Sequence, residues 1–245
     1  MSMDKNGEVY SYEDTVIPVM TVQSVLVLML AVVGGVLLAV LVLPVWLSGL
    51  SDSLFGSEPK AFWYLSRGSA LVAYGILWFS MASGLIVINK MARVWPGGPT
   101  AVDLHQFTSL LGMAFALFHA LILIGDQFIS YSLVQVLLPF GSSSYKPFWV
   151  GTGQLAFYVW AIVSFSFYVR KQISAKTWRK LHYLSYGAFL MALFHALGSG
   201  TDSSSSWASQ YYWWTSGILL FLTIYRVLVN ARVFRGNARP AVQPK

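Results

Sequence analysis

The chain has 245 residues, of which 56% are hydrophobic and only 10% are charged. An ordinary soluble domain carries about 25% charged residues, so this composition excludes a soluble globular fold. Cysteine is absent, which excludes disulfides, thiolate metal sites and a cysteine nucleophile. The formal net charge of +7 reads as a membrane topology signal and does not indicate a nucleic-acid partner.

Six apolar segments follow one another along the chain, each near the roughly 20 residues that a helix needs to cross a bilayer. They cover residues 16–47, 68–88, 104–124, 148–169, 181–197 and 211–229. The first is long enough to be tilted, broken near Gly34 and Gly35, or extended to Pro44. We therefore predict an all-α integral membrane bundle of six helices, spanning residues 16–230 between a cytoplasmic segment (1–15) and a short basic tail (231–245).

The basic residues predict the orientation of these helices. If the N-terminus lies inside, only Lys60, Arg67 and Lys146 of the 16 Lys and Arg residues fall on the outer side. This distribution obeys the positive-inside rule. It predicts that both termini are cytoplasmic and that the protein is a multi-pass protein of the plasma membrane, in bacteria the inner membrane, in contact with anionic lipid.

All four histidines lie in the third and fifth segments, as His105 and His119 in one and His182 and His195 in the other. The hexamer Ala-Leu-Phe-His-Ala-Leu occurs in both, at residues 116–121 and 192–197. Both segments run from inside to outside, so equivalent histidines lie at nearly equal depth. At 1.5 Å per residue, the two levels are about 20 Å apart.

Two levels of paired imidazoles suit haem iron with two axial histidines, because a planar macrocycle fits between helices. The spacing of His105 and His119 keeps both on one helix face, whereas His182 and His195 point about 140° apart on an ideal helix. We therefore expect the fifth segment to be overwound, kinked near Gly187, or tilted. Hydrogen-bonded structural histidines, a non-redox haem-binding or structural subunit, and a metal-ion permease are the alternatives.

His105 and His119, the run Trp178-Arg179-Lys180-Leu181-His182-Tyr183, and Ala192 to His195 resemble the ferric-reductase-like transmembrane domain family. That family includes ferric reductases, NADPH oxidases and the haem-binding membrane subunit of the bacterial methionine sulfoxide reductase system. The resemblance covers about residues 67–229. It implies two stacked b-type haems, the inner one held by His105 with His182 and the outer one by His119 with His195.

The resemblance also implies partners for the haem propionates. Arg67 occupies the place of a family arginine near the outer propionates, although an interfacial anchor is an alternative reading. Arg179 and Lys180, next to His182, are candidates for the inner propionates, or are part of the topology signal.

The function implied is transmembrane electron transfer, in an electron-transfer subunit of an oxidoreductase rather than a complete enzyme. No Gly-rich nucleotide-binding fingerprint is present, so we expect this chain to bind neither FAD nor NAD(P). The donor is expected to be a separate flavoprotein or quinol, and the acceptor to lie on the outer face, within a membrane complex. Quinone is thus a candidate second cofactor, although we interpret Trp63-Tyr64 and Tyr211-Tyr212-Trp213-Trp214 as interfacial aromatic residues.

Overall fold

The computed structural model describes residues 2–3, 9–10, 17–46, 61–91, 97–126, 129–143 and 145–237. Apart from one short antiparallel pairing of β1 (Ser2–Met3) with β2 (Val9–Tyr10), its regular elements are helical, as predicted. The helices are α2 (Val22–Trp46), α4 (Ala61–Ile88), α5 (Gly98–Ile122), η2 (Leu123–Gly125), α6 (Leu133–Leu137), α7 (Pro147–Ser166), α8 (Arg170–Ile173), α9 (Ala175–His182), α10 (Leu184–Ser199) and α11 (Ser206–Asn237).

Five of these helices are long and apolar enough to cross a bilayer, which makes the chain a membrane protein. Their candidate spans are Val22–Val42, Phe62–Ile88, Gly98–Gly125, Pro147–Ser166 and Ser206–Val229, in α2, α4, α5, α7 and α11. The fifth predicted segment corresponds to α10, whose 16 residues fall short of the roughly 20 that a perpendicular span requires.

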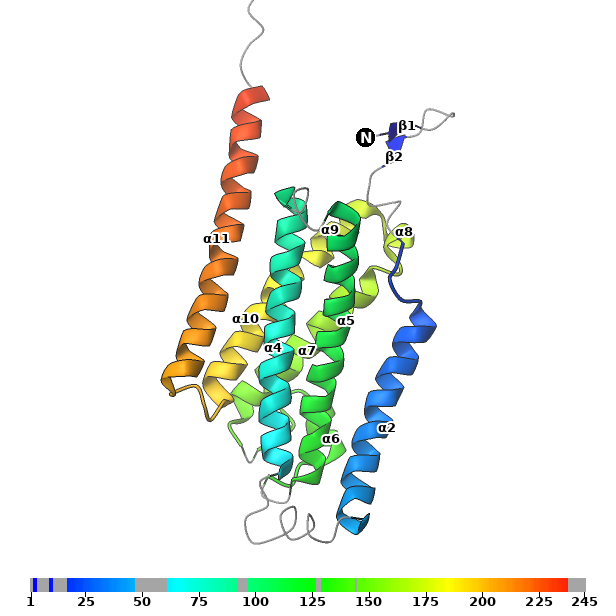
Figure 1. Ribbon diagram of the computed structural model, residues 1–245, viewed down its shortest axis with the longest axis vertical. Coiled ribbons are helices and arrows are strands. Elements are labelled where there is room, and N and C mark those ends of the chain that lie inside the picture. Colours follow the sequence, from blue (N-terminus) through cyan, green and yellow to red (C-terminus); the bar gives the residue numbers. More distant parts are fainter. Residues whose placement is uncertain are drawn as a thin grey trace, which may run out of the picture.

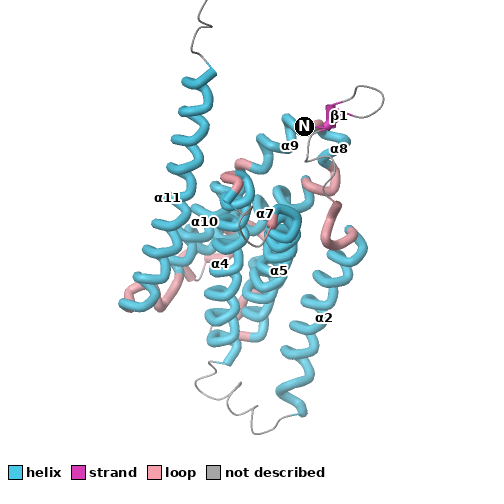
Figure 2. The backbone as a smooth tube through the Cα atoms, turned by 45° about the horizontal axis from the view of Figure 1, so that its top comes forward, coloured by secondary structure: helices cyan, strands magenta, loops and turns pink. Residues whose placement is uncertain are grey.

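The long helices run alternately up and down one axis, so that the start of α2 and the end of α11 lie at the same end of the bundle (Figure 1). Two hairpins form its centre, because α4 packs along α5 and α7 packs along α10. The outer helices flank this centre, α2 against α5 and α11 against α4, on opposite sides of the bundle (Figure 2). α5 and α10, which carry three of the four histidines, run in the same direction.

Local signals set where the central helices begin. Pro residues occupy the first turns of α5 and α7, where the missing N–H is not needed. Gly97, directly before α5, has φ 106°, a conformation that favours glycine. Local residues thus set where α5 and α7 begin.

Several helix boundaries differ from the prediction. α2 passes through Gly34 and Gly35 without a break and includes Pro44. α4 begins at Ala61, so Arg67 lies well inside this helix and not at its end. α11 continues to Asn237, into the predicted tail, because apolar residues alone mark where a helix is buried and not where its backbone stops.

The fifth predicted segment is interrupted at Tyr183, not near Gly187. α9 ends at His182 and α10 begins at Leu184, and between them the N–H of Tyr186 donates to the carbonyl of Tyr183, a tight three-residue turn. The backbone at Tyr183 stays in the right-handed helical region (φ −64°, ψ −20°), so the chain is locally overwound between His182 and His195. The angle calculated for one ideal helix therefore does not apply to them.

An apolar layer separates the two histidine levels. Met113 of α5, Tyr74 and Leu77 of α4, Trp160 of α7 and Phe189 of α10 are all buried there in one cluster. Gly112 allows the close approach of α5 and α7, because a Cβ at this position would lie 2.7 Å from the Trp160 ring. The side chains of this cluster thus lie between the two levels, and Tyr74, Leu77 and Trp160 also line a cavity that reaches His119.

Candidate functional site

The fold brings the four histidines together as two pairs. The ring centres of His119 on α5 and His195 on α10 are 6.1 Å apart, with the ring planes at 67°. The ring centres of His105 on α5 and His182 on α9 are 6.0 Å apart, with the planes at 76°. Both pairings are those that the sequence resemblance implies, and all four side chains are half-buried.

The spacing within each pair suits one metal ion between two imidazoles. A metal–imidazole bond of about 2 Å on each side, plus about 1 Å from each nitrogen to its ring centre, gives about 6 Å between ring centres. Direct hydrogen bonding between the two rings would bring them closer. Each level can therefore hold the iron of a haem with one histidine on either face of the macrocycle.

Three of the four imidazoles are anchored through Nδ1 to backbone carbonyl oxygens of the neighbouring helix. His105 donates to the carbonyl of Ser80, His119 to that of Ser66 and His195 to that of Trp149, each over 2.8 Å. A carbonyl can only accept, so Nδ1 carries the proton and Nε2 keeps its lone pair. This tautomer presents Nε2 as a metal ligand with a fixed ring orientation.

A small residue one helical turn after each accepting carbonyl gives the imidazole access to that carbonyl. A Cβ at Gly84 would lie 3.1 Å from Cε1 of His105, and a Cβ at Gly153 would lie 2.5 Å from Nδ1 of His195. Both glycines stand four residues after the accepting carbonyl, as Ala70 does after Ser66. The helix surface is therefore hollowed where each ring docks.

Serine hydroxyls add a second contact at all three of these anchors, and at His195 the hydroxyl is that of Ser199, 3.2 Å from Nδ1. Ser66 Oγ lies 2.9 Å from Nδ1 of His119 and donates to the carbonyl of His119 over 3.1 Å. Ser80 Oγ makes the same two contacts with His105, each at 3.2 Å. Ser66 and Ser80 are each followed three residues later by another serine, Ser69 or Ser83, whose hydroxyl donates back to the carbonyl of the first.

These anchors are functional residues that sequence reasoning missed, although the sequence carries a signal for them. The pairs Ser66/Ser69 and Ser80/Ser83 are separated along α4 by the same number of residues as His105 and His119 along α5. Two antiparallel helices with equal spacing align both pairs at once. The spacing of the two histidines on α5 is therefore matched by the spacing of the two serine pairs on α4.

His182 is held differently from the other three. It has no hydrogen-bond partner among the residues that the structure describes, and its ring instead packs against Trp178, one turn earlier on α9, at 5.2 Å between ring centres and 31° between planes. Trp178 in turn contacts Phe167. Aromatic packing thus orients the one imidazole that lacks a carbonyl anchor.

The outer pair lines a cavity of about 230 Å³ between α4, α5, α7 and α10. Its lining is mostly apolar, and its charged residues are Arg67 and Asp202. Tyr145 closes another part of the wall and donates its hydroxyl to the carbonyl of Ser199 over 2.7 Å. Burial raises the pKa of the Tyr145 hydroxyl, so this donor stays protonated.

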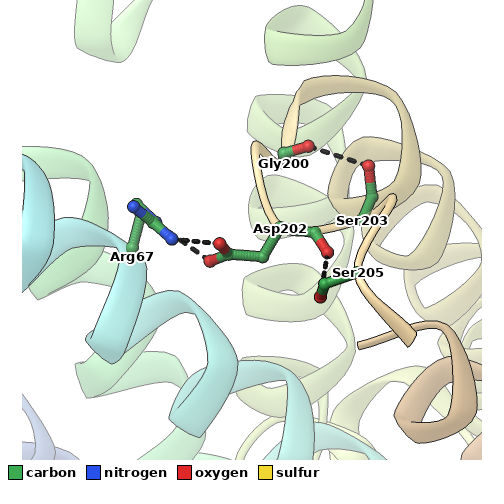
Figure 3. A network of polar contacts seen from close by, with 5 residues as sticks. All are labelled: Arg67, Gly200, Asp202, Ser203 and Ser205. Atoms are coloured by element: carbon green, nitrogen blue, oxygen red, sulfur yellow. Dashed lines mark hydrogen bonds and ion pairs between the residues drawn. The ribbon is translucent and has the colours of Figure 1, made fainter. Parts of the chain in front are cut away.

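Arg67 and Asp202, both in the wall of this cavity, pair with each other (Figure 3). Nε donates to one carboxylate oxygen over 3.0 Å, and a terminal guanidinium nitrogen donates to the other. Asp202 lies in a turn held by Ser203 and Ser205, whose hydroxyls donate to the carbonyls of Gly200 and Asp202. The structure thus brings the predicted residue Arg67 to the outer histidine pair, together with Asp202, which belongs to the resemblance but was given no role from the sequence.

The basic residues near His182 in the sequence include both exposed and buried side chains. Arg179 and Lys180 are exposed on α9, close in sequence to His182. Lys171 and Lys176 are also exposed. Arg170, by contrast, is buried: its guanidinium donates to the carbonyl of Phe167 and lies 3.8 Å over that ring. The accessible charge at this end therefore lies mainly on α8 and α9.

The aromatic clusters also divide. Trp213 and Trp214 are exposed, as expected for interfacial residues. Tyr211 and Tyr212 instead turn inward and pack edge-on against Tyr74, with ring centres 5.5 Å and 5.1 Å away. One face of α11 packs against protein, and the opposite face meets lipid. The tyrosines of this cluster lie on the first face and belong to the core.

Residues 61–202 match the protein family described as a domain of unknown function, DUF8596. The match covers more than half of the chain and includes all four histidines, and the chain belongs to this family. No curated protein and no solved structure matches the chain. Among the described residues, no group of three or more His, Asp or Glu side chains could hold a metal ion.

Proposed function

We propose that this DUF8596 protein is a membrane cytochrome b that passes electrons across the bilayer, from a donor on the cytoplasmic side or in the membrane to an acceptor on the outer face. The observation that carries the proposal is the pair of histidine sites, each with the spacing for one iron and two Nε2 ligands. Bound at both levels, haem b would supply a one-electron carrier on each side of the membrane.

The chain's own residues would do three things for these haems. His105 with His182, and His119 with His195, would provide the axial nitrogens. The carbonyls of Ser66, Ser80 and Trp149 would hold three of these rings and increase their basicity. The buried side chains of Met113 and Phe189 would limit the access of water between the levels.

In this proposal α10 is the sixth crossing, although it is short. Together α9 and α10 cover residues 175–199 with one interruption, a length that crosses a bilayer when α9 lies partly in the interface. The exposed charges of α9 fit the cytoplasmic headgroup region. The resulting topology has both termini inside, in the plasma membrane.

Arg67 is proposed as the partner of an outer propionate, and Arg179 and Lys180 as partners of the inner propionates. Arg67 lines the cavity that contains the outer histidine pair. Its pairing with Asp202 supports this role, because a guanidinium has donors to share between two carboxylates. The exposed side chains of α9 can reach a ligand edge at the headgroup level.

The donor is proposed to be a separate flavoprotein or quinol, and the acceptor an outer-face partner in a membrane complex. The membrane potential favours this direction, because moving an electron outward from a negative interior yields about 2.3 kcal/mol per 100 mV. Lys171, Lys176 and Lys180 form an exposed basic surface at the inner level. Such a surface would steer an acidic donor protein.

A reduced-minus-oxidised visible spectrum of the purified chain, with haem counted per protein, tests the proposal. We expect two haems with low-spin b-type bands that respond to dithionite. Haem that is bound but does not change on reduction would favour a non-redox or structural subunit. Binding of zinc or copper without any haem would favour a metal-ion permease.

A further inference from the structure

We propose that residues 129–143 form a re-entrant segment that dips into the outer leaflet, closes the outer histidine cavity on its lipid side, and is covered by lipid acyl chains. The short helix α6 is its centre. The inference requires that the protein lies in a membrane and does not depend on haem binding.

The segment connects the outer ends of α5 and α7, yet it lies alongside these helices and not beyond them. Figure 1 shows α6 beside the lower part of α5, with which it is in contact. On α7 its partners are Gln154 and Tyr158, which lie about 10 Å and about 16 Å along the axis from the helix start at Pro147. Half of the hydrocarbon core is about 15 Å thick, so Gln154 lies within the outer leaflet and the backbone of Tyr158 lies near the midplane.

The backbone of α6 is satisfied by side chains of the spanning helix. Gln154 Nε2 donates to the carbonyls of Gln135 and Val136 over 2.7 Å each, and its Oε1 accepts from the N–H of Phe140 over 3.1 Å. The hydroxyl of Tyr158 donates to the carbonyl of Leu137. At the membrane surface water could do this, but irregular backbone inside hydrocarbon needs protein partners.

The N-terminal end of α6 is closed in the same way. Ser132 and Gln135 form a reciprocal capping box, in which Ser132 Oγ accepts from the N–H of Gln135 and Gln135 Oε1 accepts from the N–H of Ser132. Pro139, just after α6, has no N–H to satisfy. These devices reduce the number of polar groups that would face lipid.

The outward face of α6 is apolar and continuous with the lipid side of α7. Leu133, Val134 and Leu138 are 53%, 66% and 56% exposed. Phe148 and Ile162 on α7 are also exposed, and the rings of Phe140, just after α6, and Phe148 are 6.4 Å apart. No charged residue occurs between Asp126 and Lys146. A soluble partner could not follow this surface into the span of α7, so acyl chains are the occupant.

The inward face of the segment forms part of the cavity wall. Ile129, Tyr131, Gln135 and Val136 line the cavity that contains His119 and His195. Ile129, Tyr131 and Val136 also join a buried cluster with Leu121 and Ile122 at the end of α5. The segment thus separates the outer histidine pair from lipid.

Spin labels on single cysteines test the placement, and the natural chain has no cysteine to remove. Val134→Cys and Leu138→Cys are labelled in the full chain in liposomes. Collisions with oxygen, which prefers lipid, are compared with those of a water-soluble nickel chelate. Leu220→Cys, exposed on the α11 span, is the lipid reference, and Ser204→Cys, exposed in the α10–α11 turn, is the water reference.

We expect both α6 labels to show an oxygen-to-nickel collision ratio several-fold above that of Ser204→Cys and close to that of Leu220→Cys. Ratios equal to that of Ser204→Cys would overturn the proposal and make this face a docking surface for a soluble partner. Protein that contains no haem gives the same readout, so failure of the electron-transfer proposal is distinguishable from failure of this one.

Two variants test the contacts that hold the segment. Gln154→Leu removes two hydrogen bonds to α6 and one to Phe140, and Tyr158→Phe removes one to α6 with little change in shape. We expect the Val134→Cys label to become more mobile and more accessible to nickel, with the larger change for Gln154→Leu. Thr152→Val is the control, because this hydroxyl donates within α7 to Phe148. An unchanged label in both variants would overturn the role of these side chains.

Discussion

The imidazole of His195 on α10 donates from Nδ1 to the backbone carbonyl of Trp149 on α7 over 2.8 Å. That carbonyl stands one turn before Gly153, and a Cβ there would overlap the ring. A helical carbonyl is normally hidden beside the side chain one turn further on. Glycine exposes it, so a residue without a side chain determines how a ligand ring is oriented.

Gly153→Ala is therefore expected to displace the His195 ring. Overpacking of this kind typically costs about 1–3 kcal/mol, and here the strain falls on an axial ligand. We expect the haem-to-protein ratio to fall from two towards one, with a lower unfolding temperature. Visible spectroscopy with haem extraction, and thermal unfolding in detergent, measure the two effects.

Gly187→Ala on α10 is the matched control for this change. A Cβ at Gly187 meets nothing within 4 Å, and alanine is favoured over glycine in a helix by about 1 kcal/mol. This variant should keep both haems and be as stable as the parent or slightly more so. Equal haem loss in the two variants would contradict the role assigned to Gly153.

His119→Ala is expected to remove the outer haem and leave the inner one at least partly bound. The two levels share no ligand and are about 20 Å apart, and the His105 anchor on Ser80 is not touched. The haem ratio, measured together with the spectrum of the remaining haem, checks this. Retention of two haems with unchanged spectra would show that His119 is not a ligand.

Arg67→Gln and Asp202→Asn should shift the reduction potential of the outer haem in opposite directions. Loss of the cation favours the ferric state and lowers the potential, whereas loss of the carboxylate leaves Arg67 unpaired and raises it. The pair is only partly buried, so we expect shifts of tens of millivolts, where about 59 mV is a factor of ten for one electron. Potentiometric titration measures both midpoints. If neither moves, Arg67 is an interfacial anchor.

Reversal of charge on α9 should slow reduction by an acidic flavoprotein. Lys176→Glu with Lys180→Glu removes exposed positive charge near His182, and we expect a slower rate and a weaker salt dependence in stopped-flow measurements. Lys146→Glu, at the start of α7 on the outer side, is the control and should leave the rate unchanged.

A neutral quinol would give the opposite pattern, a rate that neither salt nor these charges affect. Rapid reduction of the purified chain by NAD(P)H alone would contradict the expectation of a separate donor. Each result identifies a different route to the inner level, because only a charged protein donor responds to the basic surface.

The helical architecture could be predicted from the sequence because apolar length is a local signal, and the family resemblance implied both histidine pairings. The spacing of His182 and His195 predicted that the fifth segment is irregular, but no proline near Tyr183 marks the position of the turn. The α6 segment was also missed. Its apolar run is too short for a span, and the glutamine and tyrosine that hold it lie on another helix.

The anchors were missed for a related reason. Every residue has a backbone carbonyl, so the sequence does not show which carbonyl accepts a hydrogen bond. The acceptors at Ser80 and Trp149 are marked only indirectly, by the repeated serine pairs on α4 and by Gly84 and Gly153. The partner of Arg67 depends on the turn after α10, which brings Asp202 to α4 from far along the chain. Long-range contacts of this kind require the tertiary fold.

The hydrogen bonds to the histidines also bear on how the protein is assembled. His105 and His119 on α5 are anchored by α4, and His195 on α10 is anchored by α7, so each hairpin orients its own ligands. During synthesis the N-terminal hairpin is made first, and it already holds one preoriented ligand for each level. The second hairpin supplies the opposite ligands, so neither site is complete until nearly the whole bundle has been inserted. A chain truncated after α5 would thus contain one histidine of each pair and could complete neither site.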